Sequence, residues 1–219
     1  GIFRTLTRTC PLSLRYRQGR RASLYSLLHI RQRRYRDISL LITHSVLGRI
    51  RYESVARAGT CWEDKMKKTI VFIGTLDTKG QEIQYIKNII EQRGHRVLVV
   101  DDGILDEPTI CADIAREEVA SAAGCTLEEI RTLGSESKAV EMMTTGLCKV
   151  VKDLYGSGKL DGVISIGGGM GTSMATRAMK ELPLGVPKLM VSTKVAQSGV
   201  AKEYMGTKDI TMVSSVADI

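Results

Sequence analysis

The stretch "ISIGGGMGTS", residues 164–173, joins an apolar run to four glycines within five positions. Each glycine inside a regular element costs about 0.5–1 kcal/mol relative to alanine, so the stretch marks a tight turn or a close approach of the backbone to another group. A strand that passes through glycines into a helix presents backbone N–H groups and the positive end of the helix dipole to an anion. We therefore predict a phosphate-binding loop.

The candidate phosphate-binding residues of this loop are Gly167, Gly168, Gly169, Gly171 and Thr172. The spacing is not that of a Walker loop, which places Lys-Ser/Thr after the last glycine, and it is not the dinucleotide fingerprint G-x-G-x-x-G. The alternative interpretation is a close-packed crossover from strand to helix, in which Thr172 only caps the helix.

A second polar loop, "GTLDTKG", follows the apolar run that begins at Thr69. Its candidate ligand-binding residues are Gly74, Thr75, Asp77, Thr78 and Lys79. The hydroxyls and the ammonium suit phosphate oxygens, and Asp77 could reach a magnesium ion or a ribose hydroxyl. The alternative is a helix start capped by threonine and aspartate. Against it, Lys79 falls in the first helical turn, where the dipole disfavours a cation, and a bound anion would explain that position.

Two further loops have a similar composition. Asp101 and Asp102 end an apolar run, and an acidic residue there is the usual partner of a nucleotide ribose in doubly wound folds, so Asp101 is a candidate; it is equally a turn former. The stretch "STKVAQSG" offers Ser192, Thr193 and Lys194, which could close over the same ligand, or the stretch could be a simple turn.

The elements that must position these loops alternate along the chain. Short apolar runs predict strands at 69–75, 95–103, 161–168, 187–193 and 209–215. Apolar residues at helical spacing predict helices at 80–94, 108–124, 126–134, 135–158 (with Ser135 as N-cap) and 170–183. Continuous apolar strands that alternate with helices indicate an α/β fold: a three-layer, Rossmann-like parallel sheet with helices on both faces. Ligands bind such sheets at the carboxyl ends of the strands, where all four loops fall.

The charge of the chain changes at Met66. Residues 1–65 hold 14 Lys and Arg against 4 Asp and Glu, whereas the remaining 154 residues hold 18 against 20. We predict two parts: an arginine-rich preface, 1–65, that is disordered or not native, and a nucleotide-binding subdomain, 66–219. The preface also has the composition of a transit peptide or of a nucleic-acid-binding arm. Because the second part is slightly acidic, we do not expect nucleic acid as a partner.

Other features of the composition bound the function. Five dispersed cysteines suit reduced thiols in the cytoplasm better than a disulfide framework. The chain has no run of about 18 apolar residues, so we expect no membrane span. Neither a G-x-S-x-G elbow nor a His/Glu metal cluster is present, so we assign no catalytic residue and no protein metal site, and enzymatic activity stays open.

Three segments carry a family resemblance: "VFIGTLDTKGQE", "SIGGGMGTSMATRAMKELPLGVPKLMVST" and "YMGTKDITMVSSVADI". Together they resemble the N-terminal part of the Tm-1-like ATP-binding proteins, over roughly Lys67 to Ile219. The resemblance implies a Rossmann-like first subdomain, truncated here before a second α/β subdomain, homo-oligomerisation of the full-length protein, and ATP with Mg²⁺ as cofactors. The resemblance implies ligand-binding roles for residues of three loops: Gly74, Thr75, Asp77, Thr78 and Lys79 after the first strand, Gly167, Gly168, Gly169, Gly171 and Thr172 after the third, and Ser192 and Thr193 after the fourth.

Two functions follow from these observations. The first is a module that binds a nucleotide, ATP with Mg²⁺, without catalytic machinery of its own. The alternative is an enzyme of small phosphorylated or carboxylated metabolites, whose site a second subdomain completes. Both make a nucleotide or a phosphorylated small molecule the expected partner.

Overall fold

The computed structural model describes residues 67–195 and 200–215. All of them fall in the second of two units into which the chain divides, Ile38–Ile219. The predictions made for residues 1–65 and the last part of the "STKVAQSG" loop lie outside the described residues.

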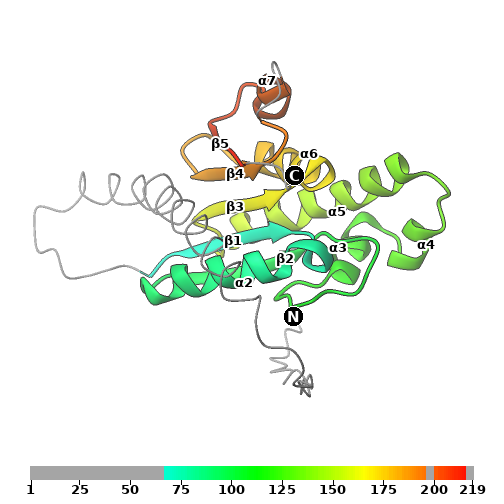
Figure 1. Ribbon diagram of the computed structural model, residues 1–219, viewed down its shortest axis with the longest axis horizontal. Coiled ribbons are helices and arrows are strands. Elements are labelled where there is room, and N and C mark those ends of the chain that lie inside the picture. The colour runs from blue at the N-terminus through cyan, green and yellow to red at the C-terminus, as the bar shows by residue number, and fades with distance from the viewer. Residues whose placement is uncertain (1–66, 196–199, 216–219) are drawn as a thin grey trace, which may run out of the picture. The chain divides into compact units, whose positions relative to one another are not determined.

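In the described part, five parallel strands form one sheet in the order β2-β1-β3-β4-β5, which Figure 1 shows from bottom to top. The strands are β1 (Thr69–Gly74), β2 (Arg96–Asp101), β3 (Gly162–Gly167), β4 (Lys188–Ser192) and β5 (Ile210–Ser214). Each matches a predicted strand to within two residues at either end. The predicted class, a three-layer α/β arrangement, is therefore confirmed.

Helices cover both faces of the sheet. They are α2 (Leu76–Gln92), α3 (Arg116–Ala123), α4 (Leu127–Arg131), α5 (Glu136–Gly156), α6 (Gly169–Lys180) and α7 (Val200–Met205). Alternate residues of a strand point to opposite faces, so Ile70 and Phe72 of β1 pack with α2, whereas Val71 and Ile73 pack with α3, α5 and α6. None of the described helices is both long and apolar enough to cross a membrane.

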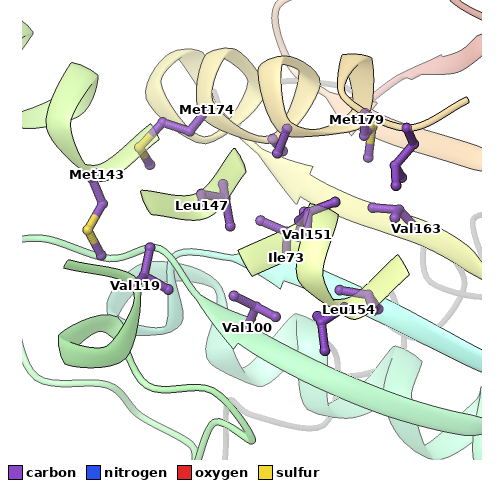
Figure 2. Packing of buried hydrophobic residues seen from close by; sticks show 14 of the residues in the cluster. Ile73, Val100, Val119, Met143, Leu147, Val151, Leu154, Val163, Met174 and Met179 are labelled. Atoms are coloured by element: carbon purple, nitrogen blue, oxygen red, sulfur yellow. The ribbon is translucent and has the colours of Figure 1, made fainter. Parts of the chain in front are cut away.

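The larger of the two cores lies between the sheet and helices α3, α5 and α6. Figure 2 shows Leu147 and Val151 of α5 close to Ile73 of β1, and Met174 of α6 belongs to the same buried cluster. These side chains are fully buried, and each contributes on the order of 1.5–3 kcal/mol through burial. This packing gives the loops at the carboxyl edge of the sheet a rigid base.

The predicted helix 108–124 is wrong in its first half, because α3 begins only at Arg116. Residues before it run beside β2 instead. The Asp113 carboxylate accepts a hydrogen bond from the Val99 amide at 2.8 Å, and Ile114 forms a parallel bridge with Val100. These contacts give the backbone of this segment partners that a helix would otherwise supply.

The first predicted helix starts earlier than expected, since α2 begins at Leu76 and contains Gly80. Ser135 does occupy the N-cap position of α5, as predicted, but its side chain does not cap the helix. Its hydroxyl lies 3.0 Å from the hydroxyl of Ser137 instead.

The strand order reverses direction beside β1. From β1 the chain moves to β2 on one side, then crosses to β3 on the other side, so the switch point lies between β1 and β3. The registers place equivalent residues in one row across the carboxyl edge of the sheet. That row, extended one or two residues past the paired positions, is Asp102, Thr75, Gly167, Ser192 and Ser214. Residues from distant loops thus become neighbours at a single edge.

Candidate functional site

The N-terminus of α6 lies at the end of β3, beside the switch point. Its N-cap residue is Gly168, and no side chain caps it. The first helical hydrogen bond of α6 runs from the Thr172 amide to the Gly168 carbonyl at 3.0 Å. The amides of Gly169, Met170 and Gly171 precede it and have no acceptor within the helix. This turn therefore offers three N–H donors at the positive end of a 12-residue helix.

The four glycines of this loop serve different purposes. A Cβ on Gly167 would lie 3.2–3.3 Å from backbone atoms of Gly171 and Thr172, so this glycine permits the close packing of α6 on β3. The crossover interpretation accounts for that position. A Cβ on Gly168 or Gly171 would meet nothing within 4 Å, and neither residue has a positive φ. Side-chain packing within the described residues does not account for these two glycines, although Gly171 itself is buried and Gly168 has a ψ of −148°.

Lys194 lies over the same helix end. Its Cε is 3.2 Å from the position that a Cβ of Gly169 would take. Its backbone amide donates to the Ser192 hydroxyl at 3.0 Å, which holds the start of the loop after β4. Within residues 67–195 and 200–215, its ammonium forms no ion pair. A cation at a helix N-terminus is disfavoured unless an anion lies between them.

Thr172 and Ser192 are brought together, as predicted, but they bind each other. Both side chains are fully buried, and their hydroxyl oxygens are 2.7 Å apart. The Thr172 hydroxyl also donates to the Gly168 carbonyl at 2.5 Å, and the Thr193 amide donates to the Gly167 carbonyl at 3.4 Å. These bonds fasten the glycine loop to β4. Direct contact of Thr172, Ser192 or Thr193 with a ligand stays a prediction.

The polar groups of the β1–α2 loop bond to one another. The hydroxyls of Thr75 and Thr78 are 2.9 Å apart, and the Asp77 carboxylate accepts a hydrogen bond from the Thr78 amide at 2.7 Å. Lys79 lies 3.8 Å from Glu82 in an i,i+3 ion pair, which offers a second explanation for a cation in the first turn. A Cβ on Gly74 would approach Ile83 Cδ1 to 2.6 Å, so this glycine makes room for α2.

Asp101 closes the N-terminus of α2. It is 2% exposed, and its Oδ1 accepts hydrogen bonds from the Leu76 amide at 3.2 Å and the Gly103 amide at 2.9 Å. Burial raises the pKa of Asp101; the two amides and the charge of Arg116 offset this effect only in part. The residue proposed from sequence as a ribose partner thus holds two backbone loops together.

Asp102 lies next to it and is 0% exposed, with neither carboxylate oxygen hydrogen-bonded. Burial, followed by the charge of Asp101, raises the pKa of Asp102 well above its ordinary value. A buried carboxyl group without a partner is costly as an anion. The sequence signal, two aspartates after an apolar run, did not reveal this burial.

Arg116 is a residue of this region that the sequence did not single out. It is 3% exposed and donates to the Glu107 carboxylate at 2.7 Å, to the Glu117 carboxylate at 3.2 Å and to the Asp106 carbonyl. These contacts fix the loop between β2 and α3. No local pattern distinguishes this arginine from exposed ones, because its partners are set by the path of that loop.

The described acidic side chains at this edge do not form a metal site by themselves. In the described ranges, no group of three or more His, Cys, Asp and Glu side chains has a geometry that could hold a metal ion. The start of α6 offers amides that have no acceptor within the helix, and the Lys194 side chain passes close to Gly169 there. The carboxylates instead lie on the β1–β2 side.

The fold and this edge define the class of the protein: a doubly wound, Rossmann-like α/β domain. Residues 68–219 match the family model described as "Uncharacterised protein family (UPF0261) N-terminal domain". The chain therefore belongs to the UPF0261 family. The matched range agrees with the segment over which the sequence resembles the Tm-1-like proteins, so the predicted relationship is confirmed.

Curated relatives share this part of the chain. A UPF0261 protein of Clostridium tetani is 43% identical over 154 residues, which cover 70% of this chain and 38% of the relative. A UPF0261 protein of Brucella suis is 36% identical over 144 residues, covering 66% and 34% respectively. The ToMV susceptible protein tm-1(GCR26) of Solanum lycopersicum is 30% identical over 162 residues, covering 67% and 21%. The matched segment thus spans less than two fifths of these relatives' lengths.

Proposed function

We propose that this domain binds a nucleotide through its phosphates at the carboxyl edge of the sheet, between the β1–α2 and β3–α6 loops, with ATP and Mg²⁺ as the ligand. The observation that carries the proposal is the uncapped N-terminus of α6 at the switch point of the sheet. Crevices at such switch points are where doubly wound sheets bind ligands. The choice of ATP with Mg²⁺ comes from the family resemblance.

Charge supports the same site. A phosphate placed between the α6 amides and the Lys194 ammonium would receive hydrogen bonds from the first turn and a charge-assisted bond from Lys194. Phosphate contacts of this kind suit an open glycine loop, because no Cβ of Gly168 or Gly171 would stand in the way. Mg²⁺ is commonly held by one or two carboxylates and the phosphates of the nucleotide, so the lack of a three-residue cluster among the described side chains is compatible with it.

The glycine at position 171 allows a direct test. Gly171→Ala adds one methyl group at a buried position. Apart from the backbone of α6 and the neighbouring residues, no described atom lies within 4 Å of it, and alanine is the better helix former by about 1 kcal/mol. The variant should therefore be at least as stable as the wild-type chain. If phosphate occupies the proposed site, the same methyl group should weaken binding of Mg-ATP about tenfold or more, measured by isothermal titration calorimetry on the 219-residue chain.

Gly156→Ala is the matched control. Gly156 is the last residue of α5, and a Cβ added to it would also meet nothing within 4 Å. It lies near the start of β3, whereas the proposed site lies at the other end of that strand. This variant should bind Mg-ATP like the wild type. If neither the wild-type chain nor its variants release heat with Mg-ATP at millimolar concentration, the proposed function is wrong.

The metabolite enzyme remains the second candidate, because the same anion site would serve a phosphorylated metabolite. A thermal-shift screen separates the two, since a true ligand raises stability by RT ln(1 + [L]/Kd). A phosphorylated or carboxylated metabolite that stabilises the chain more than ATP does at equal concentration would favour the enzyme. Cytoplasmic location and homo-oligomerisation of the full-length protein are proposals that rest on the sequence and the resemblance.

A further inference from the structure

The carboxyl end of β2 is where doubly wound nucleotide-binding folds present an acidic residue to the ribose hydroxyls. Here that position carries two aspartates, Asp101 and Asp102. Whether either can receive a sugar depends on what its carboxylate oxygens already contact.

The Asp101 carboxylate is committed to the protein backbone. Its Oδ1 accepts from the Leu76 and Gly103 amides, at 3.2 and 2.9 Å, and the residue is 2% exposed. A ribose hydroxyl could reach Oδ1 only by displacing the N-terminus of α2 or the turn at Gly103, and the 2% exposure of the residue leaves little of Oδ2 within reach. Either change would leave a buried amide without a partner, at a cost of about 1–3 kcal/mol.

The Asp102 carboxylate is inaccessible because the residue is completely buried. No solvent reaches the residue, and no other residue in the described part of the chain donates a hydrogen bond to either carboxylate oxygen. Burial and the neighbouring charge of Asp101 raise its pKa well above the ordinary value, so the neutral form is favoured. A sugar cannot reach these oxygens while the residues that bury Asp102 keep their positions.

Other groups at the edge are more accessible. Among them are the first amides of α6, which have no acceptor within the helix, and the Lys194 side chain, whose Cε lies near Gly169; the Asp77 carboxylate is half-buried. We propose that the site reads the phosphate chain of its ligand and does not read the ribose hydroxyls. This inference rests on the proposed function, which it sharpens: the ligand class is a polyphosphate whose sugar is not recognised.

The test compares three ligands on the 219-residue chain by isothermal titration calorimetry with Mg²⁺ present: ATP, 2′,3′-dideoxy-ATP and adenosine. A hydroxyl bonded to a carboxylate contributes about 1.5–3 kcal/mol, so a ribose-reading site would bind dideoxy-ATP at least tenfold more weakly. We expect ATP and dideoxy-ATP to bind within threefold of each other. Adenosine, which lacks the phosphates, should show no binding at millimolar concentration.

The outcomes are distinguishable. Loss of tenfold or more in affinity for dideoxy-ATP, with ATP still bound, overturns this inference and leaves the proposed function standing. The same comparison covers Asp77, whose half-buried carboxylate also lies in this region, because a ribose held there would weaken dideoxy-ATP equally. Adenosine binding as tightly as ATP also overturns the inference. Absence of binding by both triphosphates overturns the proposed function and the inference with it.

Discussion

Two helices begin at the carboxyl edge of this sheet, and their N-termini are treated in opposite ways. At α2 the protein fills the position itself, because the Asp101 carboxylate accepts from the Leu76 amide and Asp77 accepts from the Thr78 amide. At α6 the N-cap is a glycine, no side chain caps the helix, and the approaching side chain is the cation Lys194. Carboxylates of the protein accept hydrogen bonds from the N-terminus of α2, whereas no described side chain caps that of α6.

The difference separates a structural helix start from a binding one. A helix N-terminus is stabilised by negative charge, whether from a side chain or from a ligand. Since α2 already has its carboxylate, a ligand phosphate adds little there. At α6 the positive dipole end and the ammonium repel each other until an anion arrives, and this favours α6 as the phosphate site. The predictions below test each half of the comparison.

The largest effect is expected at the closed end. Asp101→Ala removes the acceptor of two amides at a position that is 2% exposed. We expect the free energy of unfolding, measured by urea denaturation, to fall by about 3 kcal/mol, because buried amides are left unpaired. Asp101→Asn keeps an oxygen that can accept from both amides and should lose less than half as much. Equal losses in the two variants would show that the negative charge, not the acceptor, closes α2.

The raised pKa of Asp102 predicts that the free energy of unfolding depends on pH. The pKa of Asp102 is raised in the folded protein, so the folded state binds its proton more tightly than the unfolded state does. Its contribution to stability is therefore fully present below the ordinary carboxyl pKa and is lost as the pH rises toward the raised value. Asp102→Asn cannot titrate and lacks this loss.

The stability of Asp102→Asn relative to the wild type should therefore increase from pH 4 to pH 7. Each pH unit within the window changes the difference by up to about 1.4 kcal/mol, which urea denaturation at each pH would measure. Because the charge of Asp101 contributes to the raised pKa of Asp102, the difference between the two proteins reports on the titration of the pair. Parallel pH profiles would mean that Asp102 is ionised in the folded state.

The open end predicts a change in affinity. Lys194→Gln removes the cation above Gly169 while keeping most of the side-chain length. We expect Mg-ATP to bind about tenfold more weakly, since a charge-assisted bond to phosphate contributes about 1.5–3 kcal/mol. Lys152→Gln is the matched control, because Lys152 pairs with Glu181 on the exposed surface of α5 and should leave the affinity unchanged. If both variants weaken binding equally, the effect comes from the lower net charge of the protein and not from a contact between Lys194 and the phosphate.

The elements of the fold could be predicted from the sequence because each depends on neighbouring residues. Apolar runs identified every strand, and Gly124, with a φ of 92°, ends α3 as predicted. The first half of the predicted helix 108–124 failed, because a tertiary contact, the pairing of Asp113 and Ile114 with β2, took precedence over helical spacing.

The site was predictable only as a set of loops. That the loops lie at one edge follows from a parallel sheet, which the sequence indicates. Which groups pair at that edge depends on strand order and register: Asp101 reaches Leu76 across 25 residues, and Thr172 reaches Ser192 across 20. Composition alone therefore could not separate carboxylates that hold the protein together from groups left for a ligand.

The smallest predicted effect distinguishes the cap of α2 from an ordinary one. Thr126 caps α4 through its side chain, which accepts from the Glu129 amide at 3.2 Å, whereas Thr75 at the N-cap of α2 makes no such bond. Thr126→Val should therefore cost about 1 kcal/mol in the free energy of unfolding, the usual value of a lost cap. Thr75→Val keeps the branched shape, loses only the contact with the Thr78 hydroxyl, and should cost about 0.5 kcal/mol or less. If Thr75→Val costs as much as Thr126→Val, then Asp101 is not what closes α2, and the contrast between the two helix ends loses one of its halves.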